Sequence, residues 1–225
     1  QYTMQNYVLL DFILDTGNAA GQNMVTLAAN VACDYIKKHT NHSFFLESNL
    51  NSDKKASSRN MILGRGHGVI AETMITKSVM TRVLNVDPEF LYESFNYFPI
   101  VSAMAGTKGN GLHISNALTS IYLATGQDTA CVAENSLGHF NIDKKDDGLV
   151  FRLTLPSLTV GTVGGGTRLN QQQQNLKLLG CDTGENSSRK LAEIIAAATI
   201  GLEISLLSAI ASHTWTSAHM KYGRK

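Results

Sequence analysis

The chain has 225 residues, a length that suits one large domain or two small ones. Hydrophobic residues make up 43% and charged residues 16%, so the composition supports a buried core and excludes a disordered acidic or basic tail. The formal net charge is +1 and no long basic stripe is present, which argues against nucleic acid as a partner.

The three cysteines, Cys33, Cys131 and Cys181, lie far apart in the sequence and form no CxxC pair. An odd number of widely spaced cysteines argues against a disulfide framework or a structural zinc site, and it indicates a reducing compartment. The histidine spacings give no convincing metal site, and no HExxH motif is present. We therefore predict that the chain binds no metal ion.

The first part of the chain is predicted to form a strand, a turn and a helix. The apolar run from Tyr7 to Leu14 predicts a short buried strand. A glycine-containing turn follows at residues 17–21, and apolar residues at helical spacing then predict a helix from Met24 to Lys38. Residues 44–46 are a candidate for a second short strand, which leads into the next loop.

The turn Gly17-Asn18-Ala19-Ala20-Gly21 has two interpretations. A helix N-terminus exposes unpaired N–H groups and a partial positive charge, so it attracts phosphate, and small residues let the backbone approach such a ligand. The turn does not match the GxGxxG pattern, and the alternative is an ordinary tight connection between strand and helix. The local pattern alone favours the ordinary connection.

The segment Asn49-Leu50-Asn51-Ser52-Asp53-Lys54-Lys55 is the most informative in the chain. A lysine placed in such a loop can stabilise the negative charge on a reacting carbonyl oxygen, provided that a carboxylate elsewhere holds it. The alternative is a solvated charged loop, which is what most charge runs are.

The middle of the chain is predicted to contain a strand and three helices. A strand is expected in residues 61–75, where apolar and polar residues alternate after a glycine-rich centre. Helices are expected at 77–84, at 88–97, and at 116–125, which is apolar and ends just before Asp128. A carboxylate near a helix C-terminus faces an unfavourable dipole and tends to need a cationic partner. Lys54 is a candidate for that partner.

The last part of the chain is predicted to contain a strand at 150–160, three glycines in series and a long helix. Asn186 or Ser187 could cap that helix, whose most apolar part, 191–210, is too polar for a confident membrane span and is typical of a buried helix. The glutamines at 171–174 suggest a helix face.

The motifs together resemble those of the 3-hydroxy-3-methylglutaryl-CoA (HMG-CoA) reductase family, in the family's order and with similar spacing, from about residue 17 to residue 224. The matching segments are the lysine loop with Asn60-Met-Ile-Leu-Gly-Arg-Gly66, Ser102-Ala-Met-Ala-Gly106, Gly126-Gln-Asp128, Gly161-Thr-Val-Gly-Gly-Gly-Thr167 and Ala218-His219-Met220. Each motif alone is weak, but the set is highly specific.

The resemblance implies an activity and a set of site residues. The family reduces HMG-CoA to mevalonate and free CoA with two hydrides from NADPH. By the resemblance, Lys54 stabilises the oxyanion, Asp128 hydrogen-bonds that lysine, and His219 protonates the departing CoA thiolate. The implied binding residues for NADPH are Asn18, Ala20, Gly21, Gln22, Asn23, Met24, Gly164, Gly165 and Gly166, and those for the substrate are Asn49, Lys55, His113 and Asn116.

The resemblance also implies the architecture. We expect an α+β protein in which residues 1–48 are part of a small ferredoxin-like NAD(P)-binding module. Residues 49–60 would form the catalytic lysine loop, and residues 61–225 a larger, mainly helical domain for substrate binding and dimerisation. The family forms homodimers or homotetramers with active sites between subunits. The expected location is cytoplasmic or cytosol-facing, with no transmembrane segment in this chain and the anchoring of a longer parent chain left open.

Two departures from the family support an alternative. Asn18 stands where the family usually has an aspartate. The family's catalytic glutamate lies well upstream of the cofactor turn and has no counterpart here, so we expect the chain to be N-terminally incomplete. Glu134, in Glu134-Asn135, resembles that motif only superficially. The alternative is a non-catalytic relative or fragment that binds CoA or nucleotide, or only dimerises.

Overall fold

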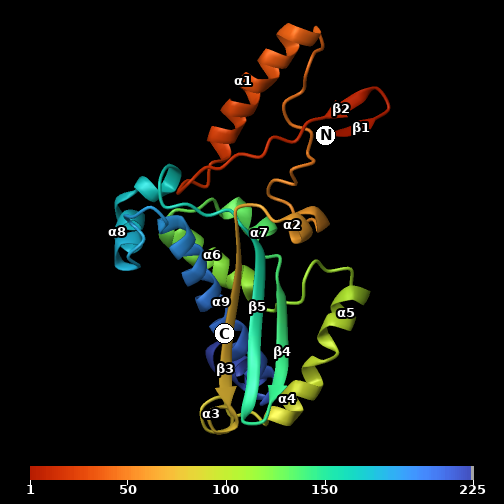
Figure 1. The fold of residues 1–225 in the computed structure, drawn as a ribbon. Coiled ribbons are helices and arrows are strands. Elements are labelled where there is room, and N and C mark those ends of the chain that lie inside the picture. Colours follow the sequence, from red (N-terminus) through yellow and green to blue (C-terminus); the bar gives the residue numbers. More distant parts are fainter. Residues whose placement is uncertain (224–225) are drawn as a thin grey trace.

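The computed structural model describes residues 1–223. The predicted ends of the family resemblance, at residue 224, and of the large domain, at residue 225, lie outside the described residues. The predicted α+β class is confirmed, since helices pack on one face of a three-stranded sheet and a separate hairpin lies near the N-terminus (Figure 1). The division at residues 48 and 60 stays a prediction.

The main sheet is antiparallel and consists of β3 (His67–Thr76), β4 (His139–Lys145) and β5 (Gly148–Leu158), in the order β3-β5-β4. In β5, every second residue, such as Phe151 and Leu153, is buried, which is the alternation that predicted this strand. The neighbouring strand β4 was not predicted.

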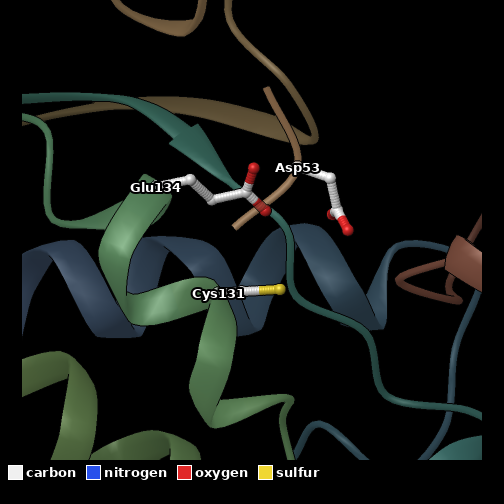
Figure 2. Close-up of side chains that lie close together, drawn as sticks. All are labelled: Asp53, Cys131 and Glu134. Atoms are coloured by element: carbon white, nitrogen blue, oxygen red, sulfur yellow. The ribbon is translucent and has the colours of Figure 1, made fainter. Parts of the chain in front are cut away.

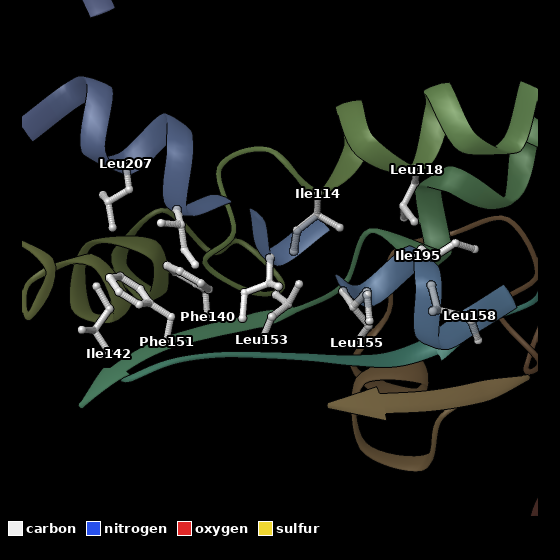
Figure 3. Close-up of a cluster of buried hydrophobic side chains, with 14 of the residues drawn as sticks. Ile114, Leu118, Phe140, Ile142, Phe151, Leu153, Leu155, Leu158, Ile195 and Leu207 are labelled. Atoms are coloured by element: carbon white, nitrogen blue, oxygen red, sulfur yellow. The ribbon is translucent and has the colours of Figure 1, made fainter. Parts of the chain in front are cut away.

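The core lies between one face of this sheet and two helices, α6 (Ile114–Thr125) and α9 (Ser187–Ala211). Figure 3 shows Ile114 and Leu118 of α6 and Ile195 of α9 close to the side chains of the strands. The helices α3 (Lys77–Arg82) and α4 (Pro88–Phe95) add buried side chains such as Met80 and Leu91 at the lower end in Figure 1.

The helix α9 is the core element predicted from residues 191–210. Within the described residues it is also the helix that is long and apolar enough to cross a membrane, with a mean hydropathy of 2.0 in its most apolar window. Because it packs against β3, β5 and α6 and buries residues along most of its length, it is a core helix here. Asn186 occupies the N-cap position, but its side chain makes no capping hydrogen bond.

The N-terminal part extends away from the sheet (Figure 1). It consists of a hairpin of β1 (Tyr2–Met4) and β2 (Tyr7–Leu9), and of α1 (Gln22–Thr40), which has no buried residue. The prediction of a buried strand over residues 7–14 was wrong, because β2 ends at Leu9 and Ile13 is 91% exposed. The expected strand at 44–46 is also absent. An apolar run shows a need for burial but does not show what covers it.

Gly64 and Gly66 explain the outcome for residues 61–75. Their φ angles of 71° and 77° are accessible to glycine but unfavourable for other residues. The chain is therefore helical before them and becomes β3 only from His67. The remaining short helices are α2 (Ser58–Leu63), α5 (Phe98–Met104), η1 (Thr129–Cys131), α7 (Val132–Asn135), η2 (Gly165–Arg168), α8 (Asn170–Leu178) and α10 (Thr214–Tyr222).

Candidate active site at the lysine loop

The lysine loop has an unusual backbone. Asn49, Ser52 and Lys54 all have positive φ angles, of 66°, 57° and 58°. Asparagine tolerates this region, but serine and lysine rarely adopt it, so the surroundings must hold the loop in place. Within the loop, Glu47 accepts a hydrogen bond from the N–H of Asn49 at 2.6 Å, and Asn51 accepts one from the N–H of Asp53 at 3.1 Å.

Lys54 and Asp128 form the ion pair that the sequence suggested. The Nζ atom of Lys54 lies 3.2 Å from a carboxylate oxygen of Asp128, and both side chains are partly exposed. The hydrogen bond and charge of Asp128 raise the pKa of Lys54, so the amine stays protonated at neutral pH. Asp128 also caps the short helix η1, because its Oδ1 accepts a hydrogen bond from the N–H of Ala130 at 3.0 Å. The cap fixes the carboxylate next to the loop.

A second group of charges lies beside this pair. Arg65 contacts Asp53, the residue before Lys54, at 2.8 Å and Glu134 of α7 at 2.7 Å. Burial alone would lower the pKa of Arg65, but the two carboxylates outweigh it and raise that pKa. Glu134 is fully buried and also accepts a hydrogen bond from Thr159 at 3.2 Å. Glu134 is thus paired with Arg65 inside the protein.

Asp53, Glu134 and Cys131 lie close enough to offer three ligand atoms to one metal ion (Figure 2). The guanidinium group of Arg65 already supplies a positive charge to both carboxylates. Burial of Cys131 raises the pKa of its thiol to about 11, so it stays protonated, whereas metal ligation needs the thiolate. The chemistry of these donors fits an internal ion pair, and we assign no metal to them.

The two segments expected to bind the cofactor lie side by side. The backbone oxygen of Asn18 accepts a hydrogen bond from the N–H of Thr162 at 2.8 Å, and Ala19 forms a β-bridge with Val163. A side chain at Gly161 would collide with the backbone of the turn. The turn leads directly into α1, whose first residues are Gln22, Asn23 and Met24.

The Gly126-Gln127-Asp128 turn packs against the same glycine segment. The side chain of Gln127 donates to the backbone oxygen of Gly161 and accepts from its N–H, both at 2.9 Å. Gly126 approaches Gly166 so closely that a side chain on either would meet the backbone of the other. Three motifs that are distant in sequence therefore meet next to the Lys54–Asp128 pair.

The structure does not bring all predicted site residues to Lys54. His113 is the N-cap of α6, and Asn116 lies in the first turn of that helix. Asp128 follows the other end of α6, and twelve helical residues span roughly 18 Å. His219 lies on α10, where its ring contacts Trp215. The helix α10 packs against α9, and Figure 1 draws this C-terminal segment well below α2 and α7. Their roles stay predictions.

Asn49 and Lys55 lie on the lysine loop itself. The Nζ atom of Lys55 donates a hydrogen bond to the backbone oxygen of Asp53 at 3.0 Å. Both side chains are exposed, so they are free to meet a ligand that reaches the loop.

Sequence reasoning missed Arg65, Asp53 and Glu134 as members of the site. Arg65 stands between two glycines in a segment that was noted only for its motif, and Glu134 was noted only for a superficial similarity. The position of Arg65 between two glycines was the one available signal in the sequence. No local pattern pairs this arginine with Glu134, a carboxylate so far along the chain.

A hollow of about 630 Å³ lies away from this site, between β3 and α9.

The comparisons with known proteins agree with one another. A family model described as hydroxymethylglutaryl-coenzyme A reductase matches residues 1–224. The 3-hydroxy-3-methylglutaryl-coenzyme A reductase of Methanocaldococcus jannaschii is 40% identical over 222 residues, which are 95% of this chain and 54% of that protein. The enzyme of Aeropyrum pernix is 40% identical over 235 residues, which cover 99% of this chain and 55% of that protein. The chain thus spans about half the length of these curated relatives.

A solved structure shares the fold. The class II 3-hydroxy-3-methylglutaryl-CoA reductase from Streptococcus pneumoniae, bound to NADPH in open conformations, aligns with a TM-score of 0.63 at 21% identity. The alignment covers 92% of this chain and 50% of that chain.

Proposed function

Because the chain belongs to the hydroxymethylglutaryl-coenzyme A reductase family, we propose that it takes part in the NADPH-dependent reduction of HMG-CoA to mevalonate and free CoA. The observation that supports this most directly is the ion pair of Lys54 with Asp128, next to two glycine-containing segments. An ordinary solvated loop would not require a carboxylate that is fixed by capping η1, as Asp128 is, and that lies 3.2 Å from the lysine.

Lys54 would stabilise the negative charge that develops on the carbonyl oxygen of the thioester, and later on that of the aldehyde. Asp128 holds the ammonium group in position and keeps it protonated, so that it is ready before the substrate arrives. Since the pair is only partly buried, a bound substrate would displace water from it, and the exclusion of water would strengthen the interaction.

The turn at residues 17–21 and the glycine loop fit a dinucleotide. No side chain caps the N-terminus of α1 at Gly21, so the first N–H groups of that helix are available to a phosphate. Gly164 and Gly165 have positive φ angles and face open space, which allows a ligand to lie directly against their backbone. NADPH would supply the two hydrides when bound, and the related pneumococcal enzyme is described as bound to NADPH.

His219, His113 and Asn116 would complete the site from a second copy of the chain. Each lies away from Lys54 in one chain, which agrees with a homodimer or homotetramer that has active sites between subunits. By this proposal, His219 protonates the departing CoA thiolate. The proposed location is cytoplasmic or cytosol-facing, which agrees with three free cysteines.

The test is a steady-state assay of the purified protein with HMG-CoA and NADPH, in which the loss of NADPH and the formation of CoA are followed. We expect Lys54→Ala to lower the rate by about a hundred- to a thousandfold, because the oxyanion loses its main cation. Lys177→Ala, at an exposed lysine of α8, is the matched control and should leave the rate unchanged. Equal rates for Lys54→Ala and the wild type would refute the proposal.

The alternative function is binding without turnover. Asn18 in place of the family's usual aspartate favours it. Calorimetric titration of the same protein with CoA and with NADPH would support this alternative if a folded chain binds either ligand and consumes no NADPH. Replacing NADPH by NADH in the assay would test the choice of cofactor.

A further inference from the structure

One short helical segment presents two carboxylates toward the lysine loop. The segment consists of η1 and α7, which are continuous. Asp128 stands directly before η1 and reaches Lys54, while Glu134 lies near the end of α7 and reaches Arg65. Arg65 in turn contacts Asp53, the neighbour of Lys54. The loop is thus held at two adjacent residues by the two ends of one rigid segment.

The carboxylate of Glu134 cannot move with the loop. It is fully buried, and it accepts hydrogen bonds from the side chains of Asn60, at 3.4 Å, and Thr159, at 3.2 Å. Asn60 and Thr159 are themselves buried, at 1% and 5% exposure. Glu134 is therefore fixed in position, and the position of Arg65 follows from it.

A single nitrogen of Arg65 joins Glu134 to the loop. Its Nη1 atom donates to both oxygens of Glu134 at 2.7 Å and to Asp53 at 2.8 Å. Apart from the Lys54–Asp128 pair, the other hydrogen bonds of the loop are local, such as those that Glu47 and Asn51 accept from neighbouring N–H groups. Without Arg65, that one pair and the local hydrogen bonds would have to hold Ser52 and Lys54 in a backbone conformation that these residues avoid.

We propose that Arg65 and Glu134 are positioning residues, which fix the lysine loop through Asp53 so that Lys54 points at Asp128 and at the reacting carbonyl. The inference rests on the proposed function for its effect on turnover, whereas its effect on Lys54 can be measured without turnover. Neither residue touches the reacting atoms. Without the Arg65–Glu134 pair, Asp53 loses its link to the buried Glu134, and Lys54 moves more freely into solvent.

The first measurement is the reactivity of Lys54 toward acetic anhydride, read by mass spectrometry, with the exposed Lys177 as internal standard. We expect Glu134→Gln and Arg65→Gln to raise the acylation of Lys54 by about threefold or more relative to Lys177. Weaker pairing with Asp128 lowers the pKa of Lys54, and one pKa unit corresponds to about a tenfold change in free amine. Arg65→Lys should restore wild-type reactivity, since one nitrogen suffices for both carboxylates.

The matched control is Arg152, which also bridges two carboxylates, Glu72 and Asp143, but on the exposed side of the sheet. Arg152→Gln should change neither the reactivity of Lys54 nor turnover. In the reductase assay, Arg65→Gln should lower kcat by about tenfold or more and leave the KM for NADPH unchanged, because a displaced lysine affects the chemical step.

The outcomes separate the inference from the proposed function. Absence of turnover in the wild-type protein would contradict the proposed function. A more reactive Lys54 in Arg65→Gln and Glu134→Gln would still support the inference. A folded Arg65→Gln with Lys54 reactivity and kcat both within twofold of wild type would overturn the inference. If Glu134→Gln fails to fold, the comparison of Arg65→Gln with Arg65→Lys tests the inference by itself. Arg65 is partly exposed, so its substitution is expected to leave the protein folded.

Discussion

At the level of one residue, the amide of Asn18 holds the proposed cofactor turn in place. Its side-chain oxygen accepts hydrogen bonds from the N–H and the hydroxyl of Ser188, both at 3.1 Å. Its side-chain nitrogen donates to the backbone oxygen of Gly184 at 3.0 Å. A carboxylate can make the first two bonds but cannot donate the third. The amide therefore ties the proposed cofactor turn to the start of α9.

The substitution Asn18→Asp is predicted to destabilise the fold. An oxygen facing the carbonyl of Gly184 loses an exposed hydrogen bond, which costs about 0.5–1.5 kcal/mol. A negative charge near the N-terminus of α9 offsets about 0.3–1 kcal/mol of that cost. Urea unfolding should show a net loss of about 0.5 kcal/mol. Asn170→Asp, at the exposed first position of α8, makes the same change without a facing carbonyl, and an equal loss there would contradict this explanation.

Cys131 is predicted to be unreactive at neutral pH. Burial raises the pKa of its thiol from 9.0 to about 11, and the nearby Glu134 and Asp128 act in the same direction. The rate of alkylation by iodoacetamide should therefore rise with pH through about 11, as followed by mass spectrometry of the Cys131 peptide. A rate that already levels off near pH 9 would contradict the assigned environment.

The same shift affects stability, and its sign follows from proton linkage. The folded state holds the proton of Cys131 more tightly than the unfolded state does. The stabilisation is fully present below pH 9, and it is lost as the pH rises toward 11. A shift of this size corresponds to about 2–3 kcal/mol.

At the level of elements, α9 holds the start of α6. Glu203 of α9 is 1% exposed and accepts hydrogen bonds from the N–H groups of Leu112, at 2.9 Å, and His113, at 2.6 Å. The N-terminus of a helix has unpaired N–H groups, and here no side chain of α6 caps them. Burial raises the pKa of Glu203, and the hydrogen bonds from the backbone oppose that shift.

Glu203→Ala is predicted to destabilise the protein by about 2–5 kcal/mol, because two N–H groups lose their acceptor in a site closed to water. The midpoint of urea unfolding measures this loss. Glu193→Ala, on the same helix, removes an exposed pair with Arg189 and should cost at most about 0.5 kcal/mol. Similar losses for the two variants would show that Glu203 has no special role at α6.

The predicted elements succeeded where the apolar pattern was long or clearly periodic. Helical spacing predicted α1, alternation predicted β5, and a long apolar stretch predicted α9. The prediction over residues 7–14 was wrong because most of that short run is exposed in the described structure. Strand β4 was missed because Phe140 and Ile142 are its two apolar residues, too few for a clear alternation. Its place in the sheet depends on pairing with β5, which no local pattern encodes.

At the level of the whole molecule, the family and the order of the motifs follow from the sequence by itself. Lys54, Asp128 and the glycine segments occur with a spacing that identifies the family, and the chemistry of each residue type indicates its use. These are local properties, because a motif depends on side-chain chemistry and on distance along the chain.

Only the tertiary structure decided which residues meet. It placed Lys54 next to Asp128 and brought Asn18 beside Thr162. It also joined Arg65 to a buried Glu134, and it placed α10, the helix that carries His219, against α9 and away from the loop in one chain. Ion pairs between distant residues depend on how helices and strands pack, and packing arises from the burial of the whole core. For that reason the sequence could suggest a lysine with a carboxylate partner but could not suggest the arginine and glutamate that hold the loop.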